Sequence, residues 1–316
     1  MRSGIALTLF GSGPKGVEKD VTALQINVLG PLSVHVGQMD MTPTAPKPRR
    51  VLALLAICAN RVVRNEQIIE ELWENSPPTS VTTTLQTYVY QLRKHLQRAL
   101  TPQSGGTGPG SAPTSELRTF AGGYMLSLAP EALDSLRFEQ LVAQGRAALE
   151  SGRTEAAARI LRDALALWRG PALVDVTPGP ILQVEVLRLE EMSKSALELR
   201  IEADLLLGRH HELLSELVGL SARQPTHEGF QAKLMLALYR AGRRSEALGV
   251  YQGARKALVA ELGVDPSGDL QRLHRAILEG DPSLSEAGPP PIGLESLAMS
   301  IPRQRRLEYR QVGAVQ

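Results

Sequence analysis

The chain has 316 residues, of which 43% are hydrophobic and 4% aromatic, and its formal net charge is +2. This length predicts about two domains, and the composition favours helices packed through Leu, Ala and Val. The single cysteine, Cys58, excludes an internal disulfide, a cysteine-based zinc site and an iron–sulfur cluster. The sequence contains neither an apolar run long enough to span a membrane nor a signal peptide. We therefore expect a cytoplasmic protein that does not bind membranes.

The first part of the chain predicts strands followed by a buried helix. We expect residues 1–22 to form a flexible leader. Residues 26–36 then predict two short strands broken by Gly-Pro, and residues 37–40 a turn. After a Pro-rich stretch, a helix is expected from about Arg49 to Ala59. It is apolar on nearly every side, which indicates burial, so a packed thiol is favoured for Cys58.

Two further helices follow. Asn65 is expected to cap the second, which ends with the apolar Trp73 before the sequence Asn75-Ser76-Pro77-Pro78 stops it. Thr79 or Ser80 can cap the third, from Val81 to about Leu100. Its apolar residues are spaced by 4, 4, 3 and 4 positions, which predicts one buried stripe: Val81, Leu85, Val89, Leu92 and Leu96.

The opposite side of the third helix carries only side chains that can donate hydrogen bonds: Thr83, Thr87, Tyr90, Gln91, Lys94 and Arg98. Residues 75–115 also contain no Asp or Glu. A surface without anions suits a polyanion such as DNA, whose major groove offers acceptors and whose phosphates line the rim. A chance gap combined with a solvated basic helix explains the charge pattern equally well.

A hairpin closes this region. Residues 101–115 are rich in Gly, Pro, Ser and Thr and predict a flexible insertion. Residues 117–128 then predict two strands around a turn, in which Gly122 and Gly123 would supply positive φ angles. Strands, three helices and a hairpin are the element order of a winged helix-turn-helix. The hairpin would be the wing, reaching the neighbouring groove with Arg118 and Thr119.

Three cations precede or begin the first helix, at the end where the helix dipole disfavours them: Lys47, Arg49 and Arg50. A bound phosphate would reverse this penalty, because helix N–H groups and the cationic side chains would converge on one anion. We therefore predict phosphate contacts here. Simple solubility is the alternative explanation.

From residue 135 onward the pattern is helical. Helices are expected near residues 135–151, 154–168, 181–207, 211–223, 228–241, 244–262 and 267–279. Gly208-Arg209 and Gly242-Arg243 lie 34 positions apart, which is the tetratricopeptide period. Residues 281–316 are expected to be a disordered tail.

Other motifs favour no catalytic or cofactor function. Gly11–Gly16 fits a dinucleotide fingerprint, but little room remains for the helix that such a site needs. The adjacent His210 and His211 should point to different helix faces and would not easily share a metal. Catalytic triad spacing is also missing. We expect a protein that binds neither a metal nor a cofactor and that is not an enzyme.

The segments PKPRRVLALLAICANRVV, IIEELWENSPPTSVTTTLQTYVYQLRKHL and LRTFAGGYMLSL resemble the Streptomyces antibiotic regulatory protein family. This resemblance implies an α+β, OmpR-type winged helix-turn-helix over residues 23–130, followed by an all-α, tetratricopeptide-like bacterial transcriptional activator domain over residues 131–280. It implies a pathway-specific activator of antibiotic or other secondary-metabolite genes. Such a protein binds direct DNA repeats beside a promoter as a dimer and recruits RNA polymerase through its sigma or alpha subunit.

The candidate residues fall into three groups. Those expected to face the bases are Thr83, Thr87, Tyr90 and Lys94. Those expected at the groove edge or on the backbone are Lys47, Arg49, Arg50, Gln86, Arg93, Arg98, Arg118 and Thr119. The loop expected to contact polymerase comprises Glu74, Asn75, Ser76, Pro77 and Pro78, although its prolines could merely separate two helices. The alternative function is a helical-repeat interaction scaffold, or an effector-responsive regulator, in which DNA binding is secondary.

Overall fold

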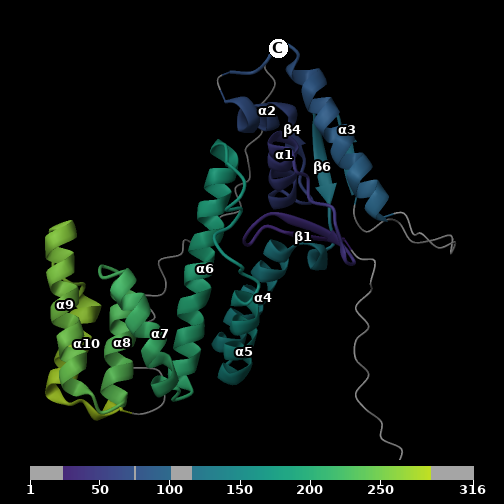
Figure 1. The fold of residues 1–316 in the computed structure, drawn as a ribbon. Coiled ribbons are helices and arrows are strands. Elements are labelled where there is room, and N and C mark those ends of the chain that lie inside the picture. The colour runs from purple at the N-terminus through teal and green to yellow at the C-terminus, as the bar shows by residue number, and fades with distance from the viewer. Residues whose placement is uncertain (1–23, 75, 101–115, 286–316) are drawn as a thin grey trace, which may run out of the picture. The chain divides into compact units, whose positions relative to one another are not determined.

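The computed structural model describes residues 24–74, 76–100 and 116–285, and the chain forms two compact units (Figure 1). Unit 1 comprises the chain up to Asn27 together with Leu32–Leu133. Unit 2 comprises Val28–Pro31 and the chain from Asp134 onward. Each unit has its own buried side chains.

Unit 1 begins with an antiparallel sheet of three strands in the order β1-β2-β3: β1 is Leu24–Asn27, β2 is Ser33–Val36 and β3 is Met39–Asp40. The two predicted strands are confirmed, and Ile26 pairs with Val34 at its centre. The turn predicted over residues 37–40 is wrong in its second half. Asp40 pairs with His35, so the chain reverses within Gly37 and Gln38 and returns as β3.

Three helices follow in unit 1: α1 is Pro46–Ile57, α2 is Asn65–Trp73 and α3 is Val81–Leu100. Helix α1 starts earlier than predicted, since a proline fits the first helical turn, where its missing N–H has no partner to lose. Asn65 is the first residue of α2 and not its cap. Arg64 holds the cap position, and its backbone N–H donates to Oε1 of Gln67 at 2.9 Å.

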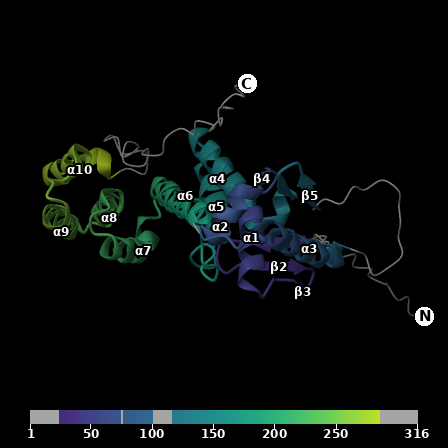
Figure 2. The same ribbon diagram turned by 90° about the horizontal axis from the view of Figure 1, so that it is seen from above.

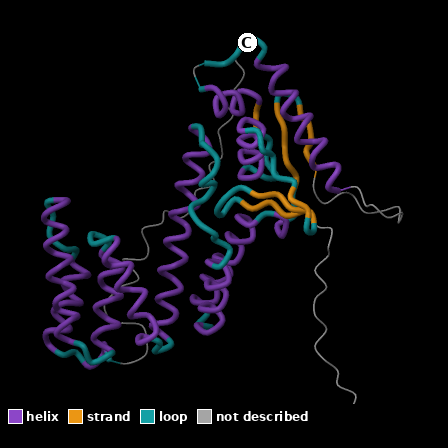
Figure 3. The backbone as a smooth tube through the Cα atoms, in the orientation of Figure 1, coloured by secondary structure: helices purple, strands orange, loops and turns teal. Residues whose placement is uncertain are grey.

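The second sheet of unit 1 has the order β4-β6-β5, where β4 is Val63–Arg64, β5 is Glu116–Phe120 and β6 is Gly123–Ser127 (Figure 3, orange). The predicted hairpin is confirmed, and Gly122 has the expected positive φ of 78°. The predicted positive φ is wrong for Gly123, which is needed for a different reason. A Cβ there would lie 2.5 Å from the carbonyl oxygen of Val63, so glycine lets β4 approach β6.

Unit 2 contains seven α-helices in its described residues: α4 Asp134–Glu150, α5 Thr154–Leu165, α6 Pro180–Leu206, α7 His210–Arg223, α8 Glu228–Arg240, α9 Arg244–Leu262 and α10 Gly268–Glu279. All lie within three residues of their predicted bounds. Gly208 and Gly242 occupy equivalent places after α6 and α8, with φ angles of 76° and 75°. Figure 2 shows α8, α9 and α10 almost end-on.

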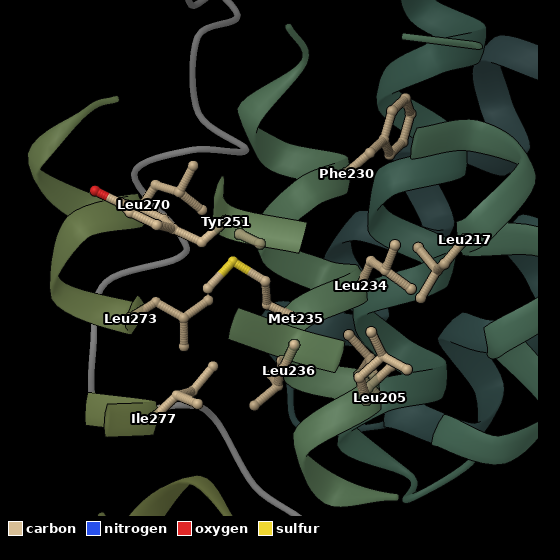
Figure 4. Packing of buried hydrophobic residues seen from close by; sticks show 14 of the residues in the cluster. Leu205, Leu217, Phe230, Leu234, Met235, Leu236, Tyr251, Leu270, Leu273 and Ile277 are labelled. Atoms are coloured by element: carbon tan, nitrogen blue, oxygen red, sulfur yellow. The ribbon is translucent and has the colours of Figure 1, made fainter. Parts of the chain in front are cut away.

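The helices from α6 to α10 share one apolar core. Phe230 and Met235 from α8 lie within it, facing Leu217 on one side and Leu273 on the other (Figure 4). A short 3-10 turn, Pro282–Leu284, adds the fully buried Leu284. The predicted disordered tail is therefore wrong for residues 281–285, and residues 286–316 lie outside the described chain. In the described residues, we find no helix with the length and apolar character to cross a membrane.

Asp134 at the start of α4 binds the Val28–Pro31 segment of unit 2. Its carboxylate accepts the backbone N–H groups of Val28 and Leu29 at 2.8 and 3.0 Å and the guanidinium of Arg169 at 2.9 Å. Burial raises the pKa of Asp134, and these hydrogen bonds together with the charge of Arg169 oppose that rise. The carboxylate thus satisfies the backbone donors of Val28 and Leu29.

Candidate nucleic-acid interface

Helix α3 has the two-sided character that its sequence predicts. Leu85, Val89, Leu92 and Leu96 are buried, whereas Val81 is half-buried at the helix start. These leucines and valines lie on one stripe because 3.6 residues per turn bring positions three and four apart onto the same face. The opposite side is therefore free to meet a ligand.

The exposed side of α3 carries the predicted base-facing residues. Thr83, Thr87, Tyr90 and Lys94 are all exposed, and Tyr90 exposes 62% of its surface. Gln86 and Gln91 are exposed as well, while the side chain of Arg98 lies outside the described residues. The hydroxyl of Thr87 donates to the carbonyl of Thr83 at 2.9 Å, so its oxygen remains able to accept a hydrogen bond.

Arg93 braces the wing. Its Nε and Nη2 donate to the carbonyl of Leu117 at 3.2 and 3.1 Å, and Nη2 also donates to the Thr119 hydroxyl at 2.9 Å. A residue predicted at the groove edge therefore links α3 to β5 of the hairpin. These three hydrogen bonds fix the wing relative to the exposed side of α3.

Three arginines surround the wing, two of which the sequence interpretation missed. The predicted Arg118 is exposed and pairs with the carboxylate of Glu116 at 2.8 Å. Arg61 and Arg64 are exposed just before and within β4, which pairs with β6. The sequence held one signal for them, because both arginines flank Val62-Val63, a pair typical of a short strand. Neighbouring strands lie about 5 Å apart, so cations at the ends of such a strand lie close to the strand that pairs with it.

The cations of the first helix make contacts inside unit 1. Arg49 donates to the carbonyls of Pro43 and Leu32 at 3.1 and 3.0 Å, and Arg50 donates to the carbonyl of Glu71 at 3.1 Å. The ammonium of Lys47 lies 4.3 Å from the centre of the Trp73 ring. These contacts were not visible in the sequence, and the phosphate role of the three residues stays a prediction.

The α2–α3 loop, Glu74–Pro78, presents an exposed surface. Glu74 has a φ of 48°, and the N–H of Ser76 donates to the carbonyl of Trp73 at 2.9 Å, which closes a tight turn. Ser76, Pro77 and Pro78 are exposed, while Asn75 lies outside the described residues. The loop thus begins at a fixed turn and continues through two prolines of restricted φ.

The two adjacent histidines lie closer together than expected. The rings of His210 and His211 are 4.5 Å apart, so the prediction that they point to separate faces is wrong. The two rings lie in a tilted arrangement, with 44° between their planes. Burial and the nearby His211 lower the pKa of His210. The described residues contain no group of three His, Cys, Asp or Glu side chains that could hold a metal. The Gly11–Gly16 motif lies outside them.

The helix-turn-helix with its hairpin wing, followed by a helical unit, defines a winged helix-turn-helix transcriptional regulator. Residues 40–104 match the family model described as "Transcriptional regulatory protein, C terminal", and residues 133–278 match "Bacterial transcriptional activator domain". The regulatory protein DnrI of Streptomyces peucetius is 46% identical over 277 residues, covering 88% of this chain and 100% of that protein.

Two further relatives agree. The transcriptional regulator RedD of Streptomyces coelicolor is 39% identical over 83% of this chain and 72% of that protein. The solved structure of Mycobacterium tuberculosis EmbR in complex with a low-affinity phosphopeptide has a TM-score of 0.76 and 32% identity, covering 87% of this chain and 68% of that one. The chain belongs to the Streptomyces antibiotic regulatory protein family. It is a transcriptional regulator and not an enzyme.

Proposed function

We propose that this protein activates transcription of a secondary-metabolite gene cluster by placing α3 in the major groove of direct DNA repeats. The observation that carries the proposal is the exposed side of α3, where Thr83, Thr87, Tyr90 and Lys94 stand opposite a buried apolar stripe. No acidic residue occurs in α3, so nothing on this helix repels phosphate. The hydroxyl groups of Thr83 and Tyr90 and the ammonium of Lys94 can donate to the acceptors of guanine and thymine edges, whereas Thr87 can accept from a base donor.

The wing supplies the backbone contacts. Arg61, Arg64 and Arg118 are exposed cations around the β5–β6 hairpin, and Arg93 fixes that hairpin to α3. Phosphate contacts of this kind position a protein on DNA without reading its sequence. We therefore assign base recognition to α3 and orientation to the wing, with Thr119 and Gln86 at the groove edge.

Recruitment of RNA polymerase is assigned to the α2–α3 loop. In a helix-turn-helix this loop leads directly into the groove helix, and here Ser76, Pro77 and Pro78 are exposed. Two prolines restrict the loop, so little conformational entropy is lost when a partner binds it. Membership of the Streptomyces antibiotic regulatory protein family supports an activator, and the exposed loop supports this site.

The arrangement on DNA is tested by half-site spacing. Two monomers bound head to tail as a dimer on DNA need centres about 10–10.5 bp apart, because the major groove presents the same face once per turn. A footprint on promoters beside the gene locates the repeats. Inserting about five base pairs between them turns one half-site to the opposite face and should abolish cooperative binding. Cooperativity that survives the insertion contradicts the proposed arrangement.

Salt dependence separates this function from that of a protein-interaction scaffold. Binding through several phosphates should weaken steeply as salt rises, with a slope of about 0.9 per phosphate on a double-logarithmic plot. A shallow slope, or equal affinity for unrelated DNA, favours the scaffold.

A further inference from the structure

Side chains from three helices meet where α2 ends. Trp73 is the last residue of α2, and its ring stacks on Tyr88 of α3 with ring centres 6.3 Å apart and an angle of 17° between the planes. The ammonium of Lys47, from the first turn of α1, lies 4.3 Å from the centre of the same ring. The Trp73 side chain is therefore held between α1 and α3 just before the α2–α3 loop begins.

A second contact ties α1 to the same end of α2. Arg50, one turn after Lys47, donates to the carbonyl oxygen of Glu71 at 3.1 Å. The last carbonyls of a helix have no partner within the helix, and the helix dipole makes this end attractive to cations. Lys47 and Arg50 are thus unfavourable for the N-terminus of α1 but favourable beside the C-terminus of α2.

The backbone passes the constraint on to the loop. The carbonyl of Trp73 accepts the N–H of Ser76 at 2.9 Å, and Glu74 between them has the left-handed φ of 48°. Trp73 therefore holds the turn through its main chain while its side chain is fixed by Lys47 and Tyr88. A shift of this ring would change the direction in which the loop leaves α2.

We propose that Lys47 and Arg50 are positioning residues that hold Trp73, and through it the α2–α3 loop, in the orientation that RNA polymerase recognises. They then act on activation and not on DNA affinity, unlike the phosphate contacts that their sequence position predicts. The inference rests on the proposed polymerase role of the loop. Burial, followed by the charge of Arg50, lowers the pKa of Lys47, as expected for an ammonium partly removed from water beside a second cation.

The test uses the full chain and three readouts: affinity for the footprinted promoter site, its salt dependence, and transcription in vitro at saturating DNA occupancy. Lys47→Gln keeps a long side chain without the charge, and Arg50→Gln removes the guanidinium. Lys47→Arg restores a cation over the ring. A Trp168→Phe background leaves Trp73 as the only tryptophan, so its emission reports the stack directly.

We expect Lys47→Gln and Arg50→Gln to bind DNA with unchanged salt slope. Transcription should fall about two- to fivefold for Lys47→Gln, the factor that one exposed cation–π contact provides. Trp73 emission should shift in Lys47→Gln and return toward the parent value in Lys47→Arg, together with transcription. Loss of affinity with a salt slope reduced by about one would identify phosphate contacts and overturn the proposal.

A loop variant keeps the two proposals distinguishable. Alanines at Glu74, Asn75 and Ser76, with both prolines kept, should bind DNA normally and transcribe poorly. If this variant is impaired but Lys47→Gln and Arg50→Gln transcribe like the parent, the positioning proposal fails and the polymerase role stands. If the loop variant transcribes in proportion to its DNA occupancy, the polymerase role fails and the positioning proposal fails with it.

Discussion

The two units use their polar side chains in opposite ways. Among the described residues, unit 1 buries one charged side chain, Glu71, whereas unit 2 buries seven polar or charged ones: Asp134, Ser135, Glu198, Arg200, Asp204, Gln231 and Lys233. The exposed donors of unit 1 lie on α3 and around the wing. Buried polar groups therefore fix helix against helix in unit 2, whereas we propose that the exposed donors of unit 1 bind DNA.

The clearest buried network in unit 2 joins α6 to α8. The carboxylate of Glu198 accepts from Nε2 of His227 at 3.2 Å and from Nζ of Lys233 at 3.3 Å, and Lys233 is 5% exposed. Removing one member of a buried ion pair leaves the other charge buried without a partner that offsets its loss of hydration. We therefore predict that Glu198→Ala lowers the unfolding free energy by about 3–5 kcal/mol.

Urea unfolding followed by circular dichroism measures this loss. The matched control is Glu191→Ala, which removes an exposed carboxylate from the same helix and its 3.2 Å pair with Lys194. Exposed pairs contribute little, so the control should unfold almost like the parent. Equal losses in both variants would remove the distinction between buried and exposed charge on α6.

The same network makes unit 2 sensitive to acid. Burial raises the pKa of Glu198, but the hydrogen bond from His227 and the charges of Lys233 and His227 outweigh it, so the pKa lies below its ordinary 4.5. A lowered carboxyl pKa stabilises the fold fully above the ordinary value, and this stability is lost as pH falls through the folded value. The stability gap between the parent and Glu198→Gln should narrow below about pH 4.5. A difference in unfolding free energy that does not change with pH would contradict the stabilising role of the ionised Glu198.

Close helix packing distinguishes unit 2 in a smaller way. A Cβ on Gly145 of α4 would lie 2.6 Å from Cγ of the buried Leu161 of α5. Gly145→Ala should destabilise the protein, because overpacking costs about 1–3 kcal/mol against a helix-propensity gain of about 1 kcal/mol. Gly249→Ala in α9, where nothing lies within 4 Å, should instead stabilise it by up to about 1 kcal/mol. Thermal unfolding of the two variants measures both changes in stability. Changes of the same sign would refute the packing argument.

The smallest expected effect concerns the arginines of the wing in unit 1. Arg64→Ala should weaken binding to all DNA sequences alike and lower the salt slope by about one. Arg118→Ala should lower it by less, since Glu116 already neutralises part of that charge in the free protein. Anisotropy titrations at several salt concentrations measure both slopes. Sequence-selective loss in Arg64→Ala would move that residue into base recognition.

Local patterns predicted most of this fold. The spacing of Leu85, Val89, Leu92 and Leu96 was enough to locate α3 and its exposed side, because the helical period is a local property. Glycines such as Gly208 mark the ends of helices in unit 2, so the predicted helix bounds lie close to the observed ones.

Several misses are long-range or steric, whereas the cap at Asn65 and the turn over residues 37–40 were local errors of one or two residues. The residues around Lys47 in the sequence do not predict its contact with Trp73, which lies on another helix. The need for glycine at position 123 comes from the Val63 carbonyl on another strand. Arg93 is predicted at the groove edge, and its partners on β5 lie 24 and 26 residues away in the sequence. Contacts between elements decide such residues, and periodicity carries no information about them.

The base-reading role of α3 is tested most directly by the ratio of affinities for the footprinted site and a scrambled duplex. Lys94→Ala and Tyr90→Ala should each lose the discrimination at one base pair, which is worth about 1–3 kcal/mol. Each substitution should therefore lower the affinity ratio about five- to 150-fold, with unchanged circular dichroism. The control Gln252→Ala, at an exposed position of α9, should leave the ratio at the parent value. If all the α3 variants, including Thr83→Ala and Thr87→Ala, keep the parent ratio while folded, α3 does not read the operator.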